Sequence, residues 1–263
     1  MPVVLSKKNE PAAYELINST GRGKVILIAD HASNRIPQSL KNLGLNNQIL
    51  DSHLAWDPGT AIVAKALSIV LDAPLIMANY SHLVIDCNRA PDNKESIVPI
   101  KDGIPIPGNK NLSEDEKLHR KTEIFDPYHR AISELMDERR HYCDCLISIH
   151  SFSPMLNKNY QPCKIGIGSG EDERLSALLL QALAKRQIHS VGKNTPFAIN
   201  KNIDYSVPHH AGSRKLPHVM LQFRNDTLNE IEGVVSQALI VSSALESAAY
   251  NLSTLQETEL IVA

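Results

Sequence analysis

Short, continuous runs of apolar residues constrain the fold of this chain more than any other feature of its sequence. The clearest are residues 25–29 and 145–149, where apolar side chains follow one another with almost no polar interruption. Continuous apolar runs of this length indicate strands that are buried on both faces, as in a parallel sheet. Further strands are predicted at residues 74–78, 82–86, 164–168 and 218–223.

Segments with helical periodicity separate these predicted strands. Apolar residues recur at the spacing of one helix face over residues 59–71, 173–187 and 228–250. Ser113 and Glu116 fit a capping box that opens another helix, which runs towards Arg140 and is broken or kinked at Pro127. Because strands and helices alternate, the sequence predicts an α/β fold of three layers: a mostly parallel mixed sheet with helices on both faces.

The length of 263 residues fits one domain with a substantial buried core. The sequence shows no repeat or composition shift, so a single domain is predicted over residues 1–263, with its core at about 20–250 and loosely attached ends. Hydrophobic residues make up 43% of the chain, which excludes a disordered protein. A net charge of −2 argues against nucleic acid as a partner, since proteins that bind it usually carry a basic stripe.

The sequence also carries expectations about location. Its apolar runs are too short for a transmembrane helix, and the N-terminal segment lacks the apolar stretch of a signal peptide. The cysteines show no CxxC spacing and are predicted to be reduced rather than paired: Cys87, Cys143, Cys145 and Cys163. Together these features predict a cytoplasmic protein with no membrane partner.

Polar residues gather at the ends of several predicted strands. The clusters are Asp30 and His31 with Asn34; Asp86 with Asn88 and Arg89; His150 with Ser151; and Gln222 with Arg224 and Asp226. In open α/β sheets, ligands bind in the crevice beyond the carboxyl ends of the strands. Because a structural explanation would have to be repeated for every cluster, the sequence predicts a functional site at this edge of the sheet.

The histidines of these clusters point to a metal. Neutral imidazole is a common zinc ligand, and a catalytic zinc site holds three protein ligands and an open position. His31 and His150 are expected to supply two of the ligands. The third is Asn34 or Asp57; a carboxylate is the better zinc ligand, although Asp57 also fits a turn before Pro58.

Arginine side chains suggest an anionic substrate. The guanidinium groups of Arg89 and Arg224 match a carboxylate in two parallel hydrogen bonds. Either arginine can instead pair with a nearby acid, Asp86 or Asp226.

Histidines outside these clusters give weaker signals. His129 fits an orienting group or an ordinary helix residue, whereas His209 and His210 fall in a predicted loop that can cover the site. One of that pair, His210 in our interpretation, is a candidate proton donor.

The sequence resembles the N-formylglutamate amidohydrolase family. The resemblance rests on short segments in matching order: DHASNRIP (30–37), AWDPG (55–59), LVIDCNR (83–89), FDPYH (125–129), IHSF (149–152), VGKNTP (191–196) and LPHV (216–219). It implies a phosphorylase/hydrolase-like fold related to zinc carboxypeptidases. It also implies hydrolysis of a small N-acylated acidic amino acid, with N-formylglutamate, giving formate and glutamate in histidine breakdown, as the named case.

The same resemblance implies roles for individual residues. His31 and His150 match the metal histidines, with zinc as the expected metal, and Asn88 with Arg89 matches the pair that grips the substrate carboxylate. Asn34 stands where carboxypeptidase-like enzymes have a glutamate ligand three residues after the first histidine, which again points to Asp57 as a replacement.

One position departs from the family pattern. Gln222, two residues before Arg224, stands where the family usually has the glutamate that acts as general base. An amide cannot take up that proton, and such assistance is worth about 10² to 10⁴ in rate. His210 or Asp57 are the candidates to replace it. Two alternatives to the amidohydrolase therefore stay open: a homologue that binds an acidic amino acid derivative without efficient catalysis, and a metal-dependent peptidase or amidase acting on another substrate.

Overall fold

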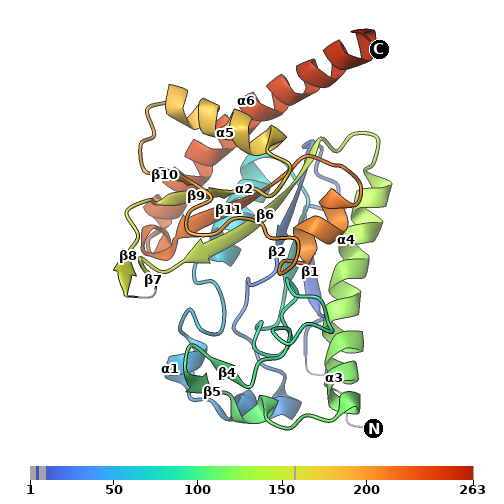
Figure 1. The fold of residues 1–263 in the computed structure, drawn as a ribbon, viewed down its shortest axis with the longest axis vertical. Helices are drawn as coiled ribbons and strands as arrows, with labels where there is room; N and C mark the ends of the chain where they lie inside the picture. Colours follow the sequence, from blue (N-terminus) through green and yellow to red (C-terminus); the bar gives the residue numbers. More distant parts are fainter. Residues whose placement is uncertain (1–3, 6–9, 157, 263) are drawn as a thin grey trace.

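The computed structural model describes residues 4–5, 10–156 and 158–262, with side chains as far as Leu252 (Figure 1). Its centre is a seven-stranded sheet in the order β1-β3-β2-β6-β11-β9-β10. The strands are β1 (Tyr14–Ile17), β2 (Val25–Ala29), β3 (Leu75–Ala78), β6 (Cys145–Phe152), β9 (Ile165–Gly168), β10 (Val191–Lys193) and β11 (His218–Arg224). Neighbours from β3 to β11 run parallel, whereas β1 pairs with β3 and β9 with β11 in antiparallel fashion. The mostly parallel mixed sheet is therefore confirmed.

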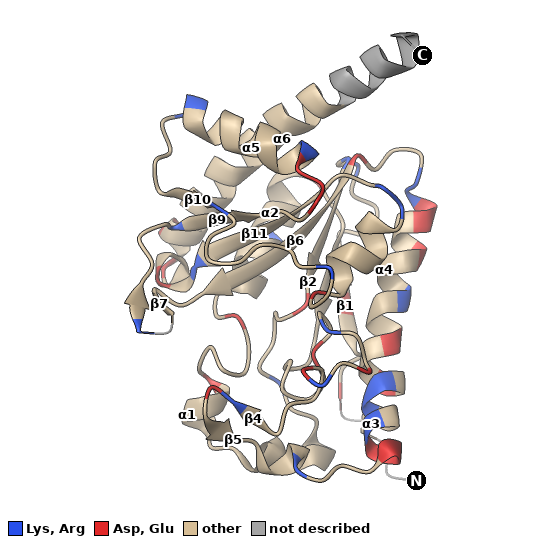
Figure 2. Ribbon diagram, in the orientation of Figure 1, with Lys and Arg blue, Asp and Glu red and all other residues tan. Residues whose placement is uncertain are grey.

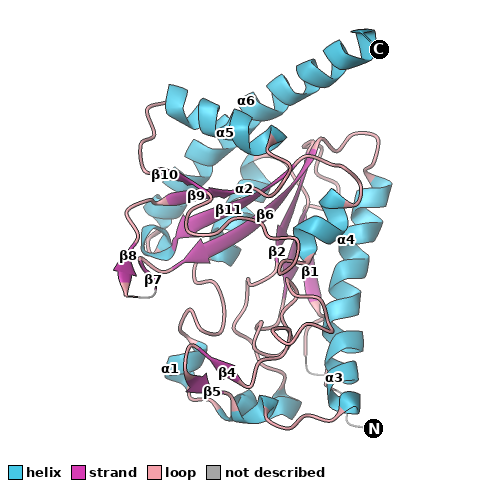
Figure 3. Cartoon of the chain, viewed as in Figure 1, coloured by secondary structure: helices cyan, strands magenta, loops and turns pink. Residues whose placement is uncertain are grey.

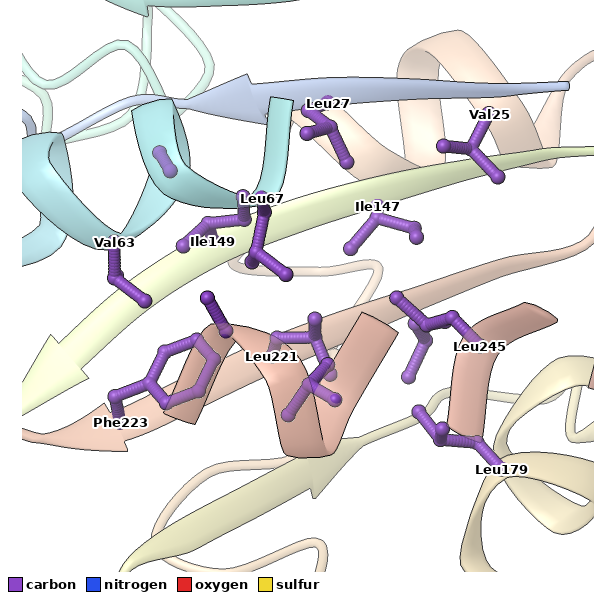
Figure 4. Close-up of a cluster of buried hydrophobic side chains, with 14 of the residues drawn as sticks. Val25, Leu27, Val63, Leu67, Ile147, Ile149, Leu179, Leu221, Phe223 and Leu245 are labelled. Atoms are coloured by element: carbon purple, nitrogen blue, oxygen red, sulfur yellow. The ribbon is translucent and has the colours of Figure 1, made fainter. Parts of the chain in front are cut away.

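Helices cover both faces of this sheet, as Figure 3 shows. Val25 and Leu27 of β2 belong to a core shared with α2 (Thr60–Val70), α5 (Arg174–Lys185) and α6 (Ile231–Val262). Figure 4 shows this core, with Leu27, Ile147 and Leu221 of the sheet facing Val63, Leu67 and Leu245 of the helices. Ile26 and Ile28 point to the other face and pack with α4 (Asp126–Glu138). Because both faces are buried, the strands are apolar at successive positions.

The predicted capping box appears in the helix on the second face, whereas the helix is not broken at Pro127. Ser113 caps α3 (Glu114–Arg120), and its hydroxyl accepts from the backbone N–H of Glu116. A π-helical segment, η3 (Lys121–Phe125), leads into α4, with Pro127 in the first turn of α4. The π-helical distortion lies directly before Pro127, which has no N–H to donate to the preceding turn, and Asp126 N–H donates to the Lys121 carbonyl. Acidic and basic residues are interspersed along α3 and α4, as Figure 2 shows.

The prediction of a strand at residues 82–86 is wrong. This segment forms turns, in which Val84 N–H donates to Ser81 and Asp86 N–H to the distant Ser96. Its apolar side chains are buried in the hydrophobic core between the sheet and α4. The apolar run at residues 82–86 therefore belongs to a buried loop and not to a strand. Two other boundaries also differ: β1 precedes the predicted core, and β6 extends beyond residue 149, so that His150 lies within the strand.

Shorter elements complete the fold. They are η1 (Gln38–Gly44), α1 (Asn47–Leu50), β4 (Ile100–Lys101), β5 (Ile104–Pro105), η2 (Pro107–Asn109), β7 (Met155–Leu156), β8 (Asn159–Tyr160), η4 (Pro208–Gly212) and η5 (Asn225–Leu228). The backbone of α6 continues through the predicted loose C-terminal end, whose side chains from residue 253 lie outside the described ones. None of the helices in the described ranges combines the length and apolarity that crossing a membrane requires.

Candidate metal centre and active site

A pocket of about 480 Å³ opens at the carboxyl ends of β2, β6 and β11. Most of the residues predicted to form a site line this pocket: His31, Asp57, Asn88, Arg89, His150 and Gln222. They come together because parallel strands end at the same edge of a sheet. His31 follows β2 by two residues, His150 lies in β6, and Gln222 of β11 is its cross-strand neighbour.

Asp57 lies between the two predicted metal histidines. Its Oδ2 is 2.8 Å from His150 Nδ1, and its Oδ1 is 3.7 Å from His31 Nδ1. The backbone N–H of Asp57 donates to the His31 carbonyl at 3.0 Å, which joins the two loops. Gly59 then takes a left-handed conformation at the start of α2, where a Cβ would lie 2.7 Å from Leu228. A glycine there lets the chain turn from Asp57 directly into the helix.

The other nitrogen of each imidazole faces a second buried carboxylate. His31 Nε2 lies 2.8 Å from Asp86 Oδ1, and His150 Nε2 lies 3.7 Å from Asp30 Oδ2. Metal-binding histidines commonly have this arrangement, in which a carboxylate behind the ring orients it and raises its basicity. Neither His150 Nε2 nor Asp30 Oδ2 has a hydrogen-bond partner among the residues that the structure describes.

His82 is a third imidazole at this centre, and the sequence interpretation missed it. Its ring meets that of His31 edge-on, with centroids 4.6 Å apart, and its Nε2 donates to the Leu54 carbonyl at 2.8 Å. That bond leaves a lone pair on Nδ1, which is buried and lacks a partner in the described part of the chain. His31, Asp57 and His82 each offer a ligand atom within 4.8 Å of the others.

The charges of this centre favour a cation. Burial opposes charge on His31, but Asp86 and Asp57 outweigh it and raise the His31 pKa to about 10. Burial also opposes charge on Asp57, yet its contacts with His150 and His31 hold the Asp57 pKa well below its usual range. Burial lowers the pKa of His82 to about 3, with a further contribution from His31. Neutral imidazole and carboxylate are the donors that zinc prefers, so these residues fit a divalent metal.

Asn34, the other predicted third ligand, points elsewhere. Its Nδ2 donates to the Leu50 carbonyl at 3.1 Å and to Asp51 at 3.2 Å, and the residue does not line the pocket. The structure therefore brings Asp57, and not Asn34, to the two histidines.

Asn88 and Arg89 lie at the pocket wall and are connected to the histidine cluster. Asp86 Oδ1, which contacts His31, also accepts from the backbone N–H of Asn88 at 2.8 Å. The side chains of Asn88 and Arg89 both donate to Asp204, at 3.1 and 3.0 Å. This contact with Asp204 was not foreseen from the sequence.

Arg224 does not line the pocket. Its Nε donates to Asp226 at 2.8 Å, and its Nη1 donates to the Tyr160 hydroxyl and the Gln161 carbonyl. Of the two roles left open for Arg224, the structure supports the pairing with Asp226.

Gln222 is fixed in the pocket by the loop that follows β10. Its Nε2 donates to the Phe197 carbonyl at 2.8 Å, whereas its Oε1 lacks a partner within the described residues. Gly168 makes this approach possible, because a Cβ there would lie 2.9 Å from the Phe197 oxygen and 3.1 Å from Gln222 Nε2.

His210 is not in a loop over the pocket. It lies in the π-helical η4, fully buried, within a chain of hydrogen bonds behind Asn88. His129 Nε2 donates to the Cys87 carbonyl at 2.8 Å, so its Nδ1 accepts from His210 Nε2 at 2.9 Å. Burial lowers the pKa of His129 to about 3 and that of His210 to about 2. This neutral chain orients the segment before Asn88, and the structure does not place His210 where it can donate a proton to a ligand.

Fold and site together define an α/β protein with a histidine and carboxylate centre at the ends of its parallel strands. The sequence model of N-formylglutamate amidohydrolase matches residues 23–229. The chain therefore belongs to the N-formylglutamate amidohydrolase family, a family of enzymes that act on amide bonds. The resemblance inferred from the sequence is confirmed.

Solved structures share the fold of this chain. The gene product Atu2144 from Agrobacterium tumefaciens is 30% identical, with 95% of this chain and 99% of that chain covered and a TM-score of 0.89. N-formylglutamate amidohydrolase from Ralstonia eutropha JMP134 is 15% identical, with coverages of 91% and 98% and a TM-score of 0.63, and shows the shared fold alone. A metallo-carboxypeptidase from Burkholderia cenocepacia shows a weaker similarity, at 12% identity, coverages of 97% and 60% and a TM-score of 0.35. The comparison with curated proteins finds no match.

Proposed function

We propose that this chain is a metal-dependent amidohydrolase that cleaves a small N-acyl acidic amino acid, with N-formylglutamate as the first candidate. The observation that carries the proposal is the position of Asp57 between His31 and His150, in the same pocket as Arg89. The candidate metal ligands and the guanidinium of Arg89 thus line one pocket of about 480 Å³, a size that suits a small molecule. Formate and glutamate are the expected products.

The residues that would hold the metal are His31 and Asp57, together with His82 or His150. When bound, a divalent ion such as Zn²⁺ would polarise the scissile carbonyl and lower the pKa of an attacking water. The chain contributes the orientation of these ligands: Asp86 contacts the far side of His31, and Asp30 faces the far nitrogen of His150.

Asn88 and Arg89 would bind the carboxylate of the substrate. A guanidinium and an amide N–H₂ group both donate, and charge-assisted hydrogen bonds to a carboxylate are about twice as strong as neutral ones. Asp86 contacts both His31 and the backbone of Asn88, so the carboxylate site and the metal ligands are held in a fixed relation.

Proton transfer is the step to which the residues of this pocket are least suited. Gln222 can accept a hydrogen bond through its unpartnered Oε1 and so orient a water, but it cannot take up a proton. Of the replacements predicted from the sequence, His210 lies outside the pocket, and the low pKa of Asp57 makes that carboxylate a weak base. This arrangement favours, as a second candidate function, a protein that binds the same ligand with little or no turnover.

A substrate panel tests the proposal. Metal-loaded protein is incubated with N-formyl and N-acetyl derivatives of glutamate, aspartate, glutamine and alanine, and formate or acetate and the free amine are measured. We expect turnover of the acidic derivatives first, and its loss in His31→Ala but not in His53→Ala, which removes an exposed histidine near Asp57. Tight binding of an acidic derivative without product would support the second candidate. If the folded, metal-loaded protein neither binds nor cleaves any of them, both candidates are wrong.

A further inference from the structure

Asn88 and Arg89, which we propose bind the substrate carboxylate, already bind a carboxylate of the chain itself, that of Asp204. Asp204 Oδ1 accepts from Asn88 Nδ2 at 3.1 Å and from Arg89 Nη1 at 3.0 Å. Asp204 lines the same pocket, and its side chain is 15% exposed. The acceptor position that a bound carboxylate would take on these two donors is therefore filled.

Asp204 holds the side of the Arg89 guanidinium that donates together with Asn88, whereas Arg89 Nη2 has no hydrogen-bond partner among the described residues. Arg89 Nη1 donates to the Asn88 carbonyl at 2.9 Å in addition to Asp204, and its Nε lies 3.4 Å from Glu95. A carboxylate that bridges Asn88 and Arg89 must take the acceptor position on Nη1 that Asp204 holds. Glu95 is 63% exposed and makes the longer contact, so it gives way easily, whereas Asp204 makes a shorter and better shielded one.

The backbone around Asp204 is anchored, so its side chain can move while the loop stays in place. The backbone N–H groups of Tyr205 and Ser206 both donate to Asn88 Oδ1 at 3.1 Å. Asp204 N–H donates to the Asn200 carbonyl at 2.7 Å, and Asp204 Oδ2 accepts from Asn200 N–H at 2.8 Å. When the Asp204 side chain rotates, only the hydrogen bonds of its carboxylate are lost, and those of the backbone are kept.

We infer that Asp204 is an internal competitor that occupies the carboxylate subsite until the substrate's own carboxylate displaces it. The inference rests on the proposed function and concerns the affinity and specificity of that site. A ligand must bring a negative charge to replace Asp204 on Arg89, so neutral amides of the same shape are rejected. Asp204 thereby restricts the pocket to acidic ligands and weakens their binding.

Binding of glutarate and of its neutral diamide, glutaramide, tests this role, because neither compound contains an acyl amide of the substrate type. Isothermal titration is performed on the wild type, on Asp204→Asn, and on Asp204→Ser as a second variant. Both replacements keep an oxygen that can accept from Asn200 N–H. Glu171→Gln is the matched control, since it removes an exposed acid that pairs with Lys201 and does not contact Arg89.

We expect glutarate to bind at least about fivefold more tightly to the Asp204 variants, because a neutral competitor holds Arg89 less strongly. Glutaramide should also bind more tightly to the Asp204 variants than to the wild type, because a ligand no longer needs a charge to displace a neutral competitor. Glu171→Gln should stay within about twofold of the wild type for both compounds, as an exposed charge is screened. Weaker or unchanged glutarate binding in both variants would overturn the inference and make Asp204 a positioning residue.

A failure of the inference can be distinguished from a failure of the proposed function. If glutarate binds neither the wild type nor a variant, the role of Asp204 as a competitor is also wrong. If formate is still released from N-formylglutamate in that case, the proposed function stands alone. If it is not released, both are wrong.

Discussion

Replacing Gln222 with glutamate perturbs one buried hydrogen bond and adds the carboxyl that the resemblance to the family implies for a general base at this position. Gln222 is 1% exposed, and its Nε2 donates to the Phe197 carbonyl at 2.8 Å. An ionised carboxylate has no proton to donate there, so two oxygens would face each other. Leaving buried groups unsatisfied in this way costs about 1–3 kcal/mol, and we expect the free energy of unfolding of Gln222→Glu to fall by that amount at pH 7.

The cost depends on pH in a defined direction. The protonated carboxyl can donate to Phe197, so folding raises the pKa of the introduced group above its unfolded value. The folded state then binds more protons than the unfolded state, and the loss of stability is smaller at pH 5 than at pH 7. A carboxylate with a raised pKa is also a better general base, so kcat/KM should rise by about 10² to 10⁴.

The assays are urea unfolding at pH 5 and pH 7 and formate release from N-formylglutamate by the metal-loaded variant. Gln237→Glu is the matched control: Gln237 is 8% exposed, its Oε1 also lacks a partner among the described residues, and it lies on α6 outside the pocket. The control should lose stability and gain no activity. A folded, metal-loaded Gln222→Glu protein with unchanged kcat/KM would refute the assignment of residue 222 to the base position.

Further predictions concern the metal ligands and the buried histidines. Asp57→Asn should weaken zinc binding by at least about 100-fold, as loss of a direct ligand costs more than loss of its supporting partner, whereas Asn34→Ala should change it by less than about twofold; equal effects in a metal titration would contradict the ligand set. Because the His31 pKa is raised to about 10, this ring carries a proton at pH 7 until a metal replaces it. Metal uptake should therefore release about one proton, measurable by calorimetry in buffers of different ionisation enthalpy, and uptake without release would be inconsistent with His31 as a ligand. His129 and His210 have pKa values lowered to about 3 and about 2 from 6.5, so the unfolded state binds more protons below pH 6.5. Stability should be fully present above pH 6.5 and fall by up to about 1.4 kcal/mol per pH unit for each ring as the pH drops, a slope that His129→Gln should reduce in urea unfolding.

The strands could be predicted from sequence where burial on both faces left continuous apolar runs, as at residues 25–29 and 145–149. The same reasoning failed at residues 82–86, because a buried loop is equally apolar. What distinguishes the two is where the backbone N–H groups go, and here Asp86 N–H pairs with Ser96 rather than with a neighbouring strand. A distant contact of this kind leaves no local pattern in the sequence.

The candidate site could be predicted as far as the topology of the sheet determines it. His31, His150 and Gln222 meet because their strands are neighbours and parallel. Residues held by loops could not be placed in this way: His82 reaches the centre through a turn, and Asp204 reaches Arg89 from a segment far along the chain. Their positions depend on packing between segments distant in sequence.

Dependence of amide hydrolysis on bound metal tests the central claim most directly. The protein is stripped with a chelator and titrated with Zn²⁺, while bound metal and formate release from N-formylglutamate are measured on the same samples. The proposed function predicts no release from the stripped protein and a rate that rises in proportion to bound metal up to one ion per chain. A rate that is independent of bound metal, or no release at full occupancy, would contradict it.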